Sequence, residues 1–217
     1  MSSDPRHQTL IDALGAELTP VRRLLPPWLR TLGWLLVVAA IAAVLLIHFG
    51  PAPMLRRWAG APDLAWAAAG AVLTAVSAAW VAFVLGVPGR SRAWAWLPLP
   101  GVLLWIGASG MGCLRTWVVP GTSIATLHQS TDCLVFIVSF SIPLSALMIW
   151  LRRRACPLRP VLTAMMVGLA SAAASASLLG IFHAFDAAAT DLLVHALAVG
   201  IVVAANAAMG GRLLTRR

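Results

Sequence analysis

The feature that most constrains this chain is the stretch TLGWLLVVAAIAAVLLIHF, from Thr31 to Phe49, which holds no Asp, Glu, Lys or Arg. Its length is close to the roughly 20 residues that an α-helix needs to cross about 30 Å of hydrocarbon. Comparable apolar runs recur along the chain and predict six membrane-spanning helices, at 31–50, 64–87, 94–112, 133–151, 161–182 and 189–211. The composition agrees, because 60% of the residues are apolar and only 11% are charged. The sequence therefore predicts an all-α, polytopic membrane protein.

The arginines alternate between the two sides of these predicted spans, and the chain has no lysine. Thirteen fall before the first span, in the second and fourth connecting loops, or after the last span: Arg6, Arg22, Arg23, Arg30, Arg90, Arg92, Arg152, Arg153, Arg154, Arg159, Arg212, Arg216 and Arg217. Only Arg56, Arg57 and Arg115 fall on the other side. Because short cytoplasmic loops are enriched in Lys and Arg, both termini are expected in the cytoplasm. The net charge of +9 is explained by this topology, so we expect no direct binding of nucleic acid.

The polar segment before the first span contains a short amphipathic helix, predicted from Gln8 to Leu18. Its apolar side chains recur at helical spacing: Leu10, Ile11, Leu14 and Leu18. Asp12 and Glu17 lie on other faces, and Pro20 should end the helix because it disfavours helical geometry at Thr19. A single short helix cannot bury its own apolar stripe. Since this helix is acidic within and basic only after Pro20, the pattern favours a protein partner over a membrane surface.

Two cysteines are predicted at the ends of neighbouring spans on the outer side of the membrane. Cys113 ends the third span, Cys133 opens the fourth, and His128 and Asp132 adjoin Cys133. A disulfide, reactive or metal-binding thiols, and inert buried cysteines are all compatible with these positions. No C-x-x-C motif occurs, which weakens a disulfide-oxidoreductase interpretation. Other polar residues are expected at the same outer face: His48, His183, Asp186, Asp191 and His195.

The spans themselves are built for close packing. The fifth contains GLASAAASASLLG and the second AWAAAGAVLTAVSAAW, and such small residues let helix backbones approach. Asn206, in the sixth span, is expected to bond a neighbouring helix. There is no phosphate loop, no nucleophile motif and no H-E-x-x-H sequence, so no catalytic site is predicted.

The order of several motifs resembles the NrsF-type family of six-span membrane anti-sigma factors. The motifs are LIDALGAELTPVRRLLPPW, VPGRSRAW, GMGCLR, CLVF and RRRACPLRP, and they extend over nearly the whole chain. The resemblance implies a protein of the bacterial inner membrane, in which a cytoplasmic segment, 1–30, binds an extracytoplasmic-function sigma factor. It also implies that a sensor bundle, 31–217, releases the sigma factor on an envelope, metal or oxidative stress signal. The residues expected to contact the sigma factor are Leu10, Ile11, Asp12, Leu14, Leu18, Val21, Arg22 and Arg23.

The resemblance also assigns the signal to the cysteines. The family's paired cysteines match Cys113 and Cys133, while His128 and Asp132 are candidate helpers because they adjoin Cys133. Cys156 is left out of the predicted sensor, and no cofactor is implied.

Two other functions fit parts of the sequence. A membrane thiol-redox protein would also place cysteines at the outer face, but it would need a second cysteine pair that this chain lacks. A small transporter would carry ionisable groups near the middle of the bilayer, whereas here this region is nearly free of charge.

Overall fold

The computed structural model describes residues 5–17, 24–118, 127–152, 155, 158–182 and 189–215. These residues form helices and no strand: α1 (Pro5–Ala16), α2 (Pro27–Phe49), α3 (Ala52–Gly60), α4 (Pro62–Val84), the short 3-10 helix η1 (Arg92–Trp96), α5 (Leu99–Val118), α6 (Leu127–Arg152), α7 (Pro160–Phe182) and α8 (Ala189–Thr215). Six of the helical segments are long and apolar enough to cross a membrane, which confirms the predicted number of spans.

The boundaries of the spans follow from local sequence signals. Prolines stand at the first helical positions of α2, α4 and α7, where the missing N–H costs no hydrogen bond. Gly50 ends α2 with a φ of 74°, a left-handed conformation that glycine adopts without a steric penalty. The third span was predicted at 94–112, and the segment that could cross the membrane runs from Arg92 to Gly112, with the 3-10 helix η1, capped by Ser91, preceding α5.

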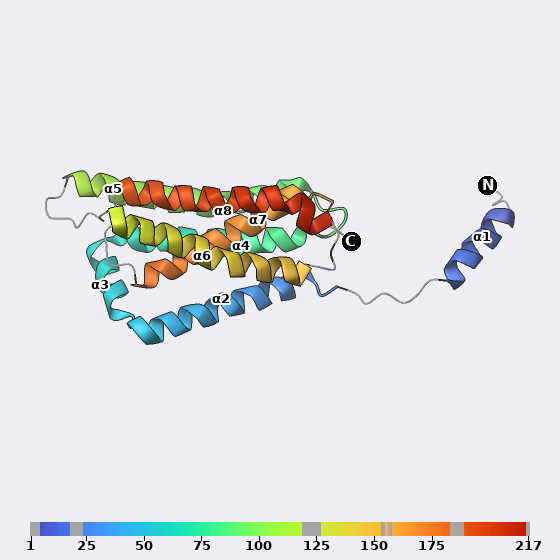
Figure 1. Cartoon of the computed structure of the whole chain (residues 1–217), viewed down its shortest axis with the longest axis horizontal. Coiled ribbons are helices and arrows are strands. Elements are labelled where there is room, and N and C mark those ends of the chain that lie inside the picture. Colours follow the sequence, from blue (N-terminus) through green and yellow to red (C-terminus); the bar gives the residue numbers. More distant parts are fainter. Residues whose placement is uncertain are drawn as a thin grey trace.

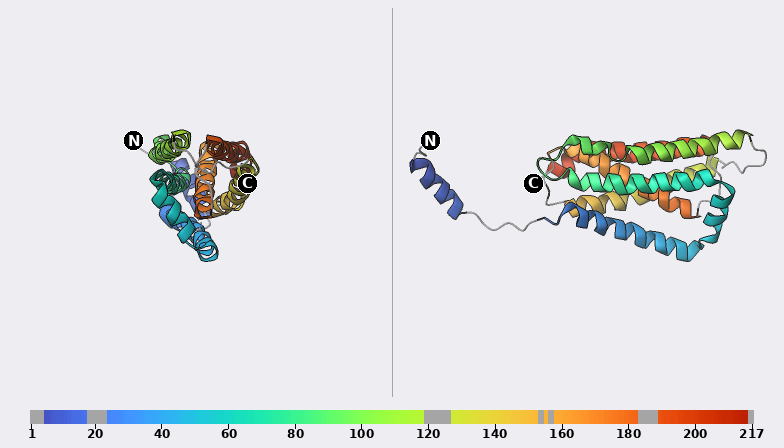
Figure 2. Two further views of the ribbon diagram at one scale, coloured as in Figure 1. Left: turned by 90° about the vertical axis from the view of Figure 1, so that its left-hand side faces the viewer. Right: turned by 180° about the vertical axis from the view of Figure 1, so that it is seen from behind.

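Helices α4 and α7 form the centre of the bundle. Helix α7 packs against α4, α6 and α8, while α4 also packs against α5 and, less extensively, α2. The end-on view in Figure 2 shows α7 between α4 on one side and α6 and α8 on the other. These two helices are also the most buried of the spans: 61% and 67% of the residues in their apolar stretches are buried, against 6% for α2. Helix α2 is therefore the peripheral span.

The predicted close packing of the small-residue spans is confirmed. A Cβ atom added at Gly70 of α4 would lie 2.5 Å from the backbone nitrogen of Trp105 in α5. A Cβ atom added at Gly168 of α7 would lie 2.9 Å from the Cα atom of Val203 in α8. Since real Cβ atoms do not approach backbone so closely, glycine is required for the helices to pack at this separation.

Polar side chains also join the spans. Asn206 donates a hydrogen bond from Nδ2 to the Ser145 hydroxyl of α6 at 3.3 Å, as expected for an amide inside the bundle. The hydroxyls of Ser141 in α6 and Ser175 in α7 lie 3.2 Å apart. Hydrogen bonds of this kind stabilise membrane helix pairs by about 0.6 kcal/mol on average.

Candidate functional site

The N-terminal helix α1 lies apart from the bundle and presents its apolar residues to solvent (Figure 1). Leu10, Ile11 and Leu14 are 57%, 59% and 57% exposed. Three neighbouring apolar side chains on one face of an isolated helix form a surface that gains free energy when a partner covers it. Leu18, Val21, Arg22 and Arg23, which belong to the same predicted surface, lie outside the described residues.

Helix α2 follows this N-terminal segment, and its first turns hold it to the bundle. Arg30, Thr31 and Trp34 are its buried residues. The indole Nε1 of Trp34 donates a hydrogen bond to the Leu144 carbonyl of α6 at 3.1 Å. Because most of the rest of α2 is exposed on the protein, this contact fixes the position of α2 relative to α6 near the start of the span.

The second contact of α2 lies at its other end and is aromatic. Phe49 stacks on Phe182 of α7, with ring centroids 4.8 Å apart. Phe182 also meets Phe136 of α6 edge to face at 5.1 Å. Such aromatic pairs contribute about 0.5–1.5 kcal/mol beyond the area they bury. The end of α2 is thus joined to α6 through one phenylalanine of α7.

Cys133 lies beside this aromatic group. Its side chain is 5% exposed and packs in a small cluster with Ile137, Leu179 and Ala198, against which Phe136 and Phe182 also pack. The cluster joins α6, α7 and α8 near the end of the bundle that carries α3, and we call this end the thiol end. A change in volume or polarity at the Cys133 sulfur would alter the packing of Phe182, and with it the aromatic contact between Phe182 and Phe49 of α2.

The other predicted sensor residues are placed less completely. Cys113 lies in the last turns of α5 and His128 in the first turn of α6, but their side chains lie outside the described set, and Asp132 is exposed. Helix α5 packs on α4 and touches α8, whereas α6 packs on α7 and α8. The pairing of Cys113 with Cys133 therefore stays a prediction. Among the described residues, no group of three or more His, Cys, Asp or Glu side chains is arranged to hold a metal ion.

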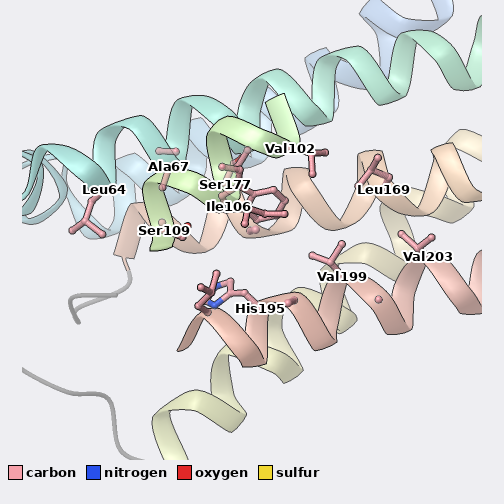
Figure 3. A pocket seen from close by; sticks show the side chains of 18 of the residues that line it. Leu64, Ala67, Val102, Ile106, Ser109, Leu169, Ser177, His195, Val199 and Val203 are labelled. Atoms are coloured by element: carbon pink, nitrogen blue, oxygen red, sulfur yellow. The ribbon is translucent and has the colours of Figure 1, made fainter. Parts of the chain in front are cut away.

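A cavity of about 420 Å³ opens between α4, α5, α7 and α8, nearer the thiol end (Figure 3). Its walls are mostly alanine, valine, leucine and tryptophan, with Ser109, Ser177 and His195 among the few polar lining residues. His195 points from α8 toward the side chains of α5 and α7. The volume falls within the range of roughly 300–1,000 Å³ that is typical of small-molecule pockets. No pattern in the sequence predicted this cavity, because it depends on how the helices pair.

Helix α3 lies across the thiol end, and the sequence did not predict it. Arg57 of α3 donates a hydrogen bond from Nη2 to the Gly180 carbonyl at 2.8 Å. That carbonyl belongs to the last turn of α7, where carbonyl groups lack partners within the helix and the helix dipole favours a cation. One of the three arginines on the side with few positive charges thus has a structural role.

The other end of the bundle, which we call the arginine-rich end, holds the start of α2, the end of α4, η1, the end of α6 and the start of α7 (Figures 1 and 2). Here Arg159 donates a hydrogen bond to the Arg90 carbonyl at 3.3 Å and so joins two connecting segments that are far apart in sequence. Of the arginines that the sequence assigned to one side of the membrane, Arg30, Arg90, Arg92, Arg152 and Arg159 lie at this end of the described bundle.

Six apolar helices, preceded by a separate helix with an exposed apolar stripe, define a polytopic membrane protein. The chain belongs to the NrsF family, described as "Negative regulator of sigma F", which matches it over residues 14–215. This confirms the resemblance seen in the sequence. It also makes the protein a negative regulator of a sigma factor, in a family that is not an enzyme class. No curated protein and no solved structure matched the chain.

Proposed function

We propose that this protein is an anti-sigma factor that holds an extracytoplasmic-function sigma factor at the bacterial inner membrane and releases it on an envelope, metal or oxidative stress signal. The capture segment, residues 1–30, binds the sigma factor in the cytoplasm, and the bundle, residues 31–217, carries the sensor. The observation that carries this proposal is the exposed apolar stripe of α1, which the bundle leaves uncovered.

The energetic argument rests on the three described residues of the stripe. Burying a leucine or isoleucine side chain completely is worth about 1.5–3 kcal/mol, and Leu10, Ile11 and Leu14 are each more than half exposed. Together they supply several kcal/mol of association free energy when a partner covers them. The family match begins at residue 14, so it includes Leu14 and the basic part of the capture segment but not the first turns of α1.

The test replaces Leu14 by Asp in the full-length protein. A carboxylate placed in a desolvated apolar contact costs several kcal/mol, so the Leu14→Asp protein should lose its sigma factor in a pull-down from membranes. Genes that depend on the sigma factor should then be transcribed without any inducer. Normal capture by the Leu14→Asp protein, at normal membrane levels, would show that α1 is not the binding element.

A matched control introduces the same charge on the opposite face of the same helix. At 100° per residue, Ala16 lies about 200° from Leu14, and it is exposed. The Ala16→Asp protein should therefore retain the sigma factor. Loss of binding in both variants would mean that the added charge unfolds α1, and the helical content of the two isolated segments would decide this.

We further propose that Cys113 and Cys133 sense the signal, with His128 and Asp132 as neighbours that tune the thiols. The support from packing is the position of Cys133, which is buried against the aromatic group that joins α6 to α2. Oxidation or metal binding at this sulfur would shift the packing of Phe182. Because Phe182 stacks on the last residue of α2, the helix that carries the capture segment would move with it.

The corresponding experiment uses a transcriptional reporter for the sigma factor in strains carrying Cys113→Ser, Cys133→Ser or both. Each serine variant should hold the sigma factor normally and fail to release it when cells are exposed to metals or thiol oxidants. A useful switch requires the signal to favour one of the two bundle states by a few kcal/mol. Full induction in the double variant would mean that both cysteines are simply small packed side chains.

A further inference from the structure

Two arginines are buried inside the arginine-rich end of the bundle rather than exposed around it. Arg30, in the first turn of α2, is 5% exposed, and Arg152, the last residue of α6, is 1% exposed. The guanidinium carbons of Arg30 and Arg152 lie 5.3 Å and 6.0 Å from the ring centroid of Phe83, near the end of α4. Three helices thus bring two positive charges to one aromatic ring.

The ring attracts these cations but cannot accept all of their N–H donors. Nε and Nη1 of Arg30 and all three nitrogens of Arg152 are enclosed and make no hydrogen bond within the described part of the chain. A buried donor without an acceptor is expensive, and more so when it is charged. Two such cations beside each other also repel in an environment of low dielectric constant. An anion that accepts hydrogen bonds from both guanidiniums would satisfy these donors.

Among the described residues of the bundle, no Asp or Glu lies at this end. Three of the chain's seven acidic residues precede α2, and Asp63, Asp132 and Asp191 stand near the starts of α4, α6 and α8, at the thiol end. The described part of the bundle therefore supplies no carboxylate that could accept hydrogen bonds from Arg30 and Arg152.

We propose that Arg30 and Arg152 form a binding site for a phosphate group, supplied by the head group of an anionic phospholipid. Each guanidinium presents a planar fork of N–H donors that matches two oxygens of a phosphate. Both arginines lie within one turn of a helix end, at the level where a membrane-spanning helix meets the head groups. Basic pockets between membrane helices bind anionic head groups in this way.

Access to the site involves α2. The guanidiniums open to the membrane surface when the first turn of α2, residues 27–30, moves away from α6 while Trp34 in the next turn keeps its bond to the Leu144 carbonyl. On the side of the site away from α2, Gly86 lies just after α4 and has no side chain to crowd Arg152. A Cβ atom at this position would lie 3.1 Å from Nη2 of Arg152. Binding of the phosphate would thus affect the position of α2, whether or not the capture segment holds a sigma factor.

The experiment measures thermal unfolding of the full-length protein in lipid nanodiscs. One sample contains phosphatidylcholine alone, a second includes phosphatidylglycerol, and a third contains phosphatidylcholine with inorganic phosphate at constant ionic strength. Phosphatidylglycerol should raise the unfolding midpoint, because a ligand that binds only the folded state stabilises it. Arg30→Gln and Arg152→Gln should abolish this increase, whereas Arg92→Gln, which removes an exposed arginine at the same end, should preserve it.

The lipid retained after detergent extraction, counted by native mass spectrometry, gives a second measurement. The Arg152→Gln protein should retain phosphatidylglycerol about ten-fold more weakly than the wild type, the factor expected for one lost charge-assisted hydrogen bond. Gly86→Ala keeps every charge but crowds Arg152, and it should also weaken the retention of phosphatidylglycerol. This variant therefore tests the site even if the arginine variants fail to fold.

The outcomes separate the possible sources of the phosphate. Stabilisation by phosphatidylglycerol alone supports the lipid, and stabilisation by inorganic phosphate in phosphatidylcholine supports the site with a free anion as its ligand. If wild type, Arg152→Gln and Gly86→Ala respond equally to phosphatidylglycerol, the arginine pair binds no phosphate and the proposal is wrong.

Discussion

Trp34 offers the sharpest test of how α2 is held to the bundle. Its side chain is fully buried in the main core, together with Ala78, Leu144 and Met148 among others, and its Nε1 atom donates to the Leu144 carbonyl. Replacing Trp34 by Phe keeps an aromatic ring in the same space but removes the N–H donor and part of the ring. The carbonyl of Leu144 lies inside α6 and can keep its bond within that helix, so it is not left without a donor.

The magnitude follows from these two losses. An interhelical hydrogen bond in a membrane protein is worth about 0.6 to 1.7 kcal/mol, and the missing part of the ring leaves a small cavity that costs about 1 kcal/mol. We therefore expect Trp34→Phe to destabilise the bundle by about 1.5–3 kcal/mol. Trp34→Ala should cost more, about 3–5 kcal/mol, because it empties the whole site.

The assay is reversible unfolding of the purified protein in mixed micelles with an increasing fraction of denaturing detergent, followed by circular dichroism. Trp28→Phe is the matched control, because Trp28 lies on the same helix and is 53% exposed. It should change the free energy of unfolding by no more than about 0.5 kcal/mol. Equal midpoints for Trp34→Phe and Trp28→Phe would refute the conclusion that Trp34 holds α2 in place.

Other predictions follow from single contacts. Gly70→Ala should destabilise the bundle by about 1–3 kcal/mol, because α4 and α5 must move apart to make room for the methyl group. Gly107→Ala, where a Cβ atom meets open space, should leave the unfolding midpoint unchanged, and the two midpoints are compared in the same assay. Arg57→Gln should cost about 1 kcal/mol through loss of the bond to the last turn of α7, with the exposed Arg56→Gln as control in the same assay. Reporter fusions at the C-terminus and near Ala155 should report cytoplasm and one between α5 and α6 the outer compartment; an outer C-terminus would overturn the proposed orientation.

The sequence predicted the spans well because a long uncharged run has few alternatives to a membrane helix. Each predicted span overlaps an observed helix, and the largest difference at a helix start, in the fourth span, is six residues, since α6 begins at Leu127 rather than 133. Helix α3 was missed because its two arginines and flanking prolines are typical of a loop. Its amphipathic pattern, over nine residues, was the signal that could have indicated a surface helix.

The sequence did not predict which helices pack against each other, because all the spans are similarly apolar. Which helices pair depends on where small residues of two helices coincide, as Gly70 and Gly101 do between α4 and α5. For the same reason the sequence could not predict the cavity near His195. Arg30 and Arg152 were counted as charges in loops, since a count of arginines contains no information about burial, yet both lie inside the bundle.

Helix α2 contacts the bundle near both of its ends, through Phe49 at the thiol end and through Trp34 near the capture segment. These contacts give a structural change at the thiol end a route to the capture segment. Helices α4 and α7 are packed tightly against their neighbours, because Gly70 meets the backbone of α5 and Gly168 that of α8 with no room for a Cβ atom. Helix α2 has the least burial of any span; it meets the bundle through Phe49 at one end, through Trp34 at the other, and through Leu35, Val38 and Ile41 between them. A displacement of Phe182 by a change at Cys133 is therefore resisted least by α2. Because α2 is a continuous helix, such a displacement is carried along its length to the segment that we propose binds the sigma factor.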